Sequence, residues 1–165
     1  LLLMRVTGGA FAAGRLPENY YDQFIRAADE GGMAAVCETE AYRDRITANP
    51  KHRHTLMALD PENFIKTLRE LRELFVAGAN LNVMGMKDSE LNSITAPTII
   101  IPGNDNTHAA ESAGNAHRLI PGSILHKLPL EFQDVDVVPF DKWAPYYNEI
   151  AATFDKFMQK TIKTE

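Results

Sequence analysis

The chain has 165 residues, which is the size of one domain, and its 45% hydrophobic and 24% charged residues are ordinary for a globular protein. A net charge of −5 argues against a nucleic-acid partner, because binding to phosphates depends on clustered cations. The single cysteine, Cys37, excludes an internal disulfide and favours a reducing, cytoplasmic location. The sequence has no apolar run of the roughly 18 residues that a bilayer span needs, so no membrane partner is expected.

The amino terminus is predicted to be a short buried strand over residues 1–6. It opens with the apolar run Leu1 to Leu3 and carries neither the basic stretch nor the cleavage site of a signal peptide. Buried strands of this kind pair on both edges inside parallel sheets. We therefore expect this chain to be the carboxyl-terminal part of a longer protein.

The first half of the chain is predicted to be helical. Apolar residues at helical spacing predict helices over residues 17–30, 33–46 and 61–77, and a glycine pair separates the first two. The third helix begins after an Asp-Pro cap and has an apolar stripe that is expected to face the core. That stripe consists of Phe64, Ile65, Leu68, Leu71, Leu74 and Phe75.

The second half of the chain alternates between strand and helix patterns. A β-branched run predicts a strand over residues 98–101, and a shorter apolar run predicts another over 124–128. Helices are predicted over residues 107–120 and 146–162. This order is typical of α/β proteins with parallel strands, so the predicted fold class is α/β.

Asp105 follows the predicted strand 98–101 and is the strongest candidate for a site residue. Open parallel sheets bind ligands beyond the carboxyl ends of their strands. The carboxylate can orient a catalytic imidazole, or it can simply cap the next helix. In either case Asp105→Asn is expected to leave the melting temperature nearly unchanged, because Asn caps about as well as Asp. His108 can be a base, a substrate-orienting donor, or an ordinary polar residue in a first helical turn.

Residues 94–129 resemble the late part of the α/β-hydrolase fold. Residues 94–105, ITAPTIIIPGND, resemble that family's acid-bearing strand and loop, and residues 117–129, HRLIPGSILHKLP, resemble its helix, turn and last strand. The helical first half is similar in placement to the family's inserted cap. The resemblance implies three parts: a core strand over 1–8, a helical cap or insertion over 9–92, and the C-terminal part of the α/β core over 93–165.

Two features of that family are missing from this chain. No Gly-x-Ser-x-Gly elbow carries a nucleophile, and Cys37 lies inside a predicted helix, which is typical of an inert core thiol. Gln133 falls where the family's late histidine is expected, and glutamine cannot act as a general base. The resemblance therefore implies an atypical triad and a missing N-terminal half of the same protein as the partner of this chain.

The function that the resemblance implies is hydrolysis of a small ester, amide or related substrate. Asp105 and His108 are then the candidate catalytic residues, and Asn104, Gln133 and Trp143 are candidate substrate-binding residues. Trp143 is also compatible with simple packing of the last helix. The alternative is a catalytically inactive hydrolase-like scaffold that binds a small molecule or a protein, and a homo-oligomer stays open in both cases.

A metal site is a weaker alternative. Asp134 and Asp136 could converge with Asp105 and His108 on a divalent cation, and the His-Arg-His run at residues 52–54 has an alternating pair of imidazoles. Solvated loop residues explain the same patterns. We therefore expect no metal and no other cofactor.

Overall fold

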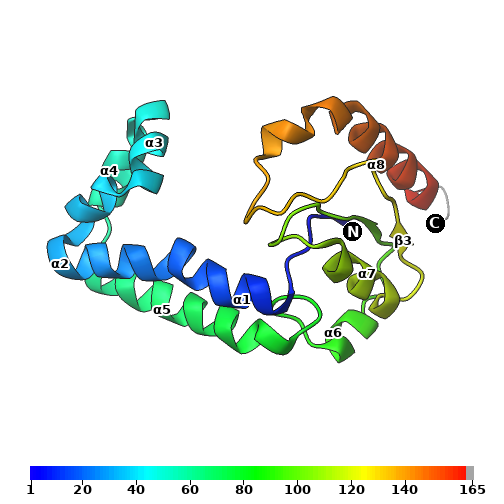
Figure 1. Cartoon of the computed structure of the whole chain (residues 1–165), viewed down its shortest axis with the longest axis horizontal. Coiled ribbons are helices and arrows are strands. Elements are labelled where there is room, and N and C mark those ends of the chain that lie inside the picture. The colour runs from blue at the N-terminus through cyan, green and yellow to red at the C-terminus, as the bar shows by residue number, and fades with distance from the viewer. Residues whose placement is uncertain (163–165) are drawn as a thin grey trace. The chain divides into compact units, whose positions relative to one another are not determined.

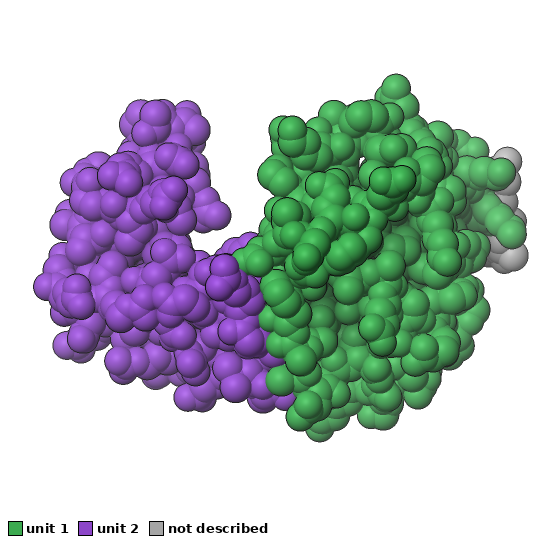
Figure 2. All heavy atoms as spheres, in the orientation of Figure 1, with its two compact units in different colours: residues 1–12, 78–165 green, residues 13–77 purple. Residues whose placement is uncertain are grey.

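The computed structural model describes residues 1–162, drawn as a ribbon in Figure 1. The chain divides into two units, which Figure 2 shows in different colours. Unit 1 comprises residues 1–12 and the chain from Gly78 onward, and unit 2 comprises Ala13–Ala77. In the described residues, no helix combines the length and the apolarity that crossing a bilayer requires.

A parallel sheet forms the centre of unit 1. Its strands β1 (Leu2–Met4), β2 (Ile99–Ile101) and β3 (Ile124–Leu125) pair in the order β1-β2-β3. All three residues of the middle strand are buried, which explains its run of β-branched isoleucines. Parallel strands with flanking helices make the fold class α/β, as the sequence predicts.

The first strand is shorter than predicted. β1 covers Leu2–Met4 rather than residues 1–6, and it hydrogen-bonds to one neighbour, β2, at an edge of the described sheet. Leu1 and Leu2 are 51% and 41% exposed. An apolar run identifies a strand but does not show how many neighbours the strand has.

Helices lie on both faces of the sheet (Figure 1). An apolar core packs against each face. Successive strand residues point to opposite faces, so Ile100 joins one cluster and Ile101 the other. The first cluster contains α6 (Asp88–Asn92) and α7 (Ala110–Leu119), and the second contains α8 (Tyr147–Ile162) and the 3-10 helix before it. The buried members are Leu91, Ile100, Ala113, Ala116 and Ile120 on one face, and Ile101, Val138, Trp143 and Ile150 on the other.

Unit 2 is a helical hairpin with two further short helices. α2 (Gln23–Glu38) packs against α5 (Pro61–Ala77), while α3 (Glu40–Ala48) and α4 (Lys51–Met57) pack around the end of α2. Its buried core consists of Ala28, Met33, Val36, Cys37 and Leu56. The predicted helix break at residues 31 and 32 is confirmed, because both glycines have non-helical backbone angles at a kink that joins two helical segments within α2, and Gly32 has a φ of +62°.

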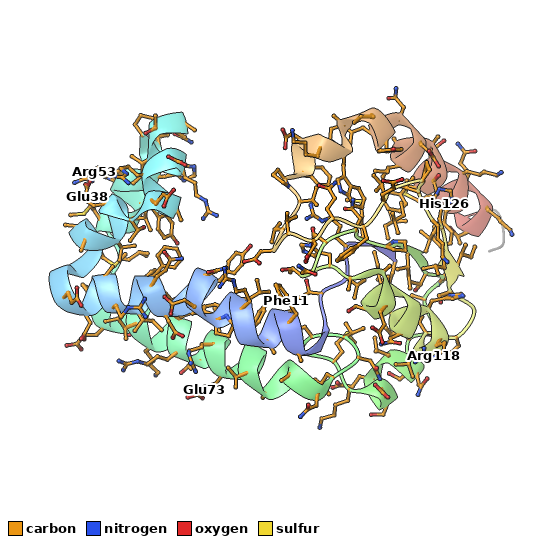
Figure 3. The ribbon with its side chains drawn as sticks, in the orientation of Figure 1. Phe11, Glu38, Arg53, Glu73, Arg118 and His126 are labelled. Atoms are coloured by element: carbon orange, nitrogen blue, oxygen red, sulfur yellow. The ribbon has the colours of Figure 1, made fainter. Side chains whose placement is uncertain are left out.

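Several helix boundaries differ from the sequence prediction. α1 (Gly9–Pro17) was not expected, and Pro17 lies at its end, where a π-helical turn (Glu18–Asp22) follows, rather than at a helix start. The basic run at residues 52–54 lies within α4 instead of a loop, and Arg53 pairs with Glu38 at 3.0 Å (Figure 3). α4 is short and polar, and α1 is rich in glycine and alanine, so neither has an apolar period that is strong enough to be read from the sequence.

The apolar stripe predicted on α5 is only partly covered. Phe64 and Ile65 pack against the core of unit 2, and Phe75 contacts Tyr21 with ring centroids 5.4 Å apart. Leu71 and Leu74 are instead 42% and 64% exposed. Within unit 2, the C-terminal half of α5 has fewer packing neighbours than its apolar period implies.

Candidate functional site

Asp105 lies just beyond the carboxyl end of β2, as predicted, and its side chain is completely buried. Four donors surround the carboxylate. Oδ1 accepts from the backbone N–H of His108 and contacts His108 Nδ1, both at 2.8 Å. Oδ2 accepts from Arg5 Nη2 at 2.8 Å and from the backbone N–H of Val138 at 2.9 Å. These contacts use the acceptor capacity of an ionised carboxylate and join three distant parts of unit 1.

Arg5 is the partner that the sequence did not reveal. It follows β1 directly, and its side chain is only 11% exposed. Nη2 donates to Asp105 and to the carbonyl of Val138, both at 2.8 Å, and the guanidinium lies 5.5 Å from the ring centroid of Trp143. Its φ of +55° is rare outside glycine and costs roughly 1–3 kcal/mol, so the ion pair holds a strained backbone.

His108 lies in a turn before α7, not in the first turn of that helix. The predicted helix start at residue 107 is therefore wrong, because α7 begins at Ala110. The Asp105 side chain accepts a hydrogen bond from the backbone N–H of His108, which stabilises the turn instead. The Nδ1 atom is 2.8 Å from the carboxylate and 3.2 Å from Arg5 Nη2. The shorter contact to a charged acceptor assigns the imidazole proton to Nδ1, which leaves the lone pair on Nε2.

The surroundings keep Asp105 ionised and His108 neutral. Burial alone raises the pKa of Asp105, but the amides of Val138 and His108 and the His108 ring outweigh it, so the pKa lies below its ordinary value. Burial lowers the pKa of His108, and Arg5 adds to this, against the opposing effect of Asp105. A neutral imidazole with Nδ1–H on a carboxylate has the protonation state of a general base.

We expect the stability of the protein to fall with acidification in two steps. The pKa of His108 is lowered on folding, so below about pH 6.5 the unfolded chain binds a proton that the folded chain does not, and stability declines. Asp105 adds a second loss as the pH falls below about 3.8 and through its lowered pKa. His108→Asn should flatten the first step in melting temperatures measured against pH. A variant curve parallel to that of the wild type would contradict this assignment.

The structure brings the other predicted site residues to the same region, in different environments. Asn104 is buried, accepts from Trp143 Nε1 at 3.2 Å and donates to the carbonyl of Glu131 at 3.0 Å. Trp143 has no exposed surface. Gln133 donates its backbone N–H to the carbonyl of Asn104 at 2.8 Å, and its side chain is exposed. Asn104 and Trp143 thus support the Asp105 loop, whereas Gln133 lies beside it in contact with solvent.

The loop after β3 runs beside the loop after β2. Backbone hydrogen bonds join Asn106 to Val135 at 3.1 Å and Thr107 to Asp136 at 3.2 Å, and Asn106 Nδ2 donates to Asp134 Oδ1 at 2.9 Å. The two aspartates nevertheless do not form a metal centre with Asp105. Within residues 1–162, no group of three or more His, Cys, Asp or Glu side chains could hold a metal ion.

Comparison with known proteins adds little to this geometry. The sequence matches no known protein-family profile, and no curated protein matches it. A crystal structure of a hydrolase from Pseudomonas aeruginosa PA01 aligns with 93% of this chain and 54% of its own, at 16% identity and a TM-score of 0.45. The chain therefore spans about half the length of that protein. A TM-score this low does not establish a shared fold, so the site rests on its own geometry.

Proposed function

We propose that this chain is part of an α/β-hydrolase-like protein that acts on a small ester, amide or related substrate. The single observation that carries the proposal is the buried Asp105 carboxylate at the end of the middle parallel strand, holding a neutral imidazole by Nδ1. Asp105 is then the positioning acid, and His108 takes a proton at Nε2. His108 would replace the late histidine of the resembling family, whose place is held by Gln133.

The connections in the sheet support the same proposal. The helical segment leaves the sheet after β1 and returns into β2, which is the neighbouring parallel strand. In this proposal, residues 1–8 are a core strand, 9–92 a cap or insertion, and 93–165 the C-terminal part of the core. Gln133 would contact the substrate through its exposed side chain, while Asn104 and Trp143 would hold the acid loop in place.

This chain contributes the acid and the base but offers no evident nucleophile. Cys37 is 1% exposed in the core of unit 2, which makes it inert. Ser112 lies inside α7 rather than on a strand-to-helix turn. The nucleophile would therefore come from a part of the protein beyond this chain, which is the proposed N-terminal half.

The test compares ester hydrolysis by the polypeptide that contains this chain with hydrolysis by its His108→Asn variant. With p-nitrophenyl acetate, we expect kcat to fall by roughly 10²–10⁴, the usual contribution of a general base, while the protein stays folded at the assay pH. His126→Asn is the matched control, because His126 also contacts a carboxylate, Glu149 at 3.2 Å, but lies elsewhere. Equal turnover in both variants would remove His108 from the mechanism.

One observation favours the alternative of a catalytically inactive scaffold. Arg5 occupies Oδ2 of Asp105, so the carboxylate has the contacts of a structural ion pair as well as those of a positioning acid. If the polypeptide turns over no p-nitrophenyl ester, the network serves to join β1, β2 and residue 138, and the protein is a hydrolase-like binding scaffold.

A further inference from the structure

Unit 1 contains a cavity of about 430 Å³ that the proposed hydrolase site does not use. It is lined by the start of α1, the loop of residues 79–82 and the first turns of α7. Neither Asp105 nor His108 lines it. Its volume lies within the range of small-molecule sites in proteins.

A buried hydroxyl faces this cavity. Ser112 is 5% exposed and lines the wall, and a Cβ at Gly8 would lie 3.0 Å from its Oγ. Within residues 1–162, no hydrogen-bond partner reaches this Oγ. In the described residues, the side-chain polar atoms that are fully buried without a hydrogen-bond partner are Arg5 Nε and Thr107 Oγ1. The Oγ of Ser112 is therefore not fully enclosed. The hydroxyl therefore opens into the cavity, where a ligand would satisfy it.

The charges around the cavity disfavour an ionic ligand of either sign. The carboxylate of Glu111 lines the wall and repels anions, and no Lys, Arg or His side chain lines the cavity to offset it. α1 and α7 both direct their N-terminal turns at the cavity, and the positive ends of helix dipoles oppose a cation. A neutral ligand avoids both penalties.

The lining also favours a ligand that brings hydrogen-bond donors. Asn82 and Asn106 direct their amide groups to Asp88 and Asp134, both at 2.9 Å, which leaves their side-chain oxygens as acceptors. Phe11, labelled on α1 in Figure 3, is 41% exposed and supplies an apolar ring at the wall. A cyclic polyol has hydroxyl groups at its edge and C–H groups on its faces. Its hydroxyl groups can donate to the acceptors, and a C–H face can pack on the aromatic ring.

We infer that this cavity binds a small, neutral, hydroxyl-rich molecule of the size of a monosaccharide or cyclitol. The inference is independent of the proposed hydrolase function, because it uses none of the Asp105 contacts. Ser112 donates to a ligand hydroxyl, the carboxylate of Glu111 and the oxygen of Asn82 accept from others, and Phe11 covers the C–H face.

Titration of the isotope-labelled polypeptide that contains this chain, followed by amide NMR, tests the inference. myo-Inositol and D-glucose are the probes, and inorganic phosphate and ethanolamine are the anionic and cationic comparisons. At least one polyol should give saturable shifts at the amides of Gly8, Phe11 and Ser112, while the two ions should not. Ser112→Ala should weaken the apparent affinity at least about tenfold, as loss of a hydrogen bond in a desolvated site does.

Two further variants separate binding from folding. Ser123→Ala removes a serine that is also buried but bonds to His117 outside the cavity, so it should leave the affinity unchanged. Phe11→Ala alters an exposed side chain, so it should preserve the fold and still weaken binding. No shift with either polyol, stronger shifts with phosphate or ethanolamine, or equal affinities in the two serine variants would overturn the inference.

Discussion

Replacing Asp105 with alanine is expected to lower the free energy of unfolding by about 3–5 kcal/mol. The carboxylate is completely buried, and its loss leaves the Arg5 guanidinium without its charged partner. It also leaves two backbone amides, those of His108 and Val138, without acceptors in the interior. Chemical denaturation followed by circular dichroism measures the change.

Asp105→Asn tests the same network without removing side-chain volume. From the sequence, Asp105→Asn is expected to leave the melting temperature nearly unchanged, but the structure predicts a clear loss. Donors face both oxygens, so either orientation of the amide places its NH₂ against an N–H group. We expect a loss of about 1–3 kcal/mol. An unfolding free energy within about 0.5 kcal/mol of the wild type would show that these contacts contribute little.

Trp143→Ala is expected to lower the free energy of unfolding by about 3–5 kcal/mol, the usual cost of truncating a buried aromatic side chain. Trp143 is completely buried with Ile101, Val138 and Ile150 in the core on one face of the sheet. Its ring also lies beneath the guanidinium of Arg5, so the substitution removes packing and a cation–π contact together. Denaturant titration measures the loss.

Two controls separate the contributions of Trp143. Trp143→Phe keeps a ring but removes the Nε1–H that reaches Asn104 Oδ1 at 3.2 Å, and it should cost less than the alanine variant. Phe140 stacks on the same ring with centroids 6.3 Å apart but is 47% exposed, so Phe140→Ala should cost less than about 1 kcal/mol. Equal losses in Trp143→Ala and Phe140→Ala would mean that burial does not set the effect.

The two residues with the largest predicted losses of unfolding free energy, Asp105 and Trp143, belong to one network of contacts. Arg5 follows β1, Asp105 follows β2, and Val138 and Trp143 belong to the segment after β3. Contacts among these residues join the three strand ends around a buried charge pair. A buried ion pair adds little net stability, although removing one of its partners is costly. We therefore infer that the main effect of the network is to fix the position of His108.

The sequence by itself determined the features that depend on near neighbours in the chain. The isoleucine run of β2, the long amphipathic α5 and the final helix α8 follow from residue period and from Pro and Gly boundaries. The contact between Asp105 and His108 is also local, because a turn brings residues three apart together.

Only the tertiary structure decided which distant groups complete the site and which apolar residues are covered. Arg5 reaches Asp105 across 100 positions, and no local pattern marks a lone arginine after a strand as an ion-pair partner. Leu2 and Leu74 have the apolar character of core residues, yet both are exposed in their own unit. Periodicity reports which face of an element is apolar, whereas burial depends on whether another element packs there, and long-range packing alone settles that.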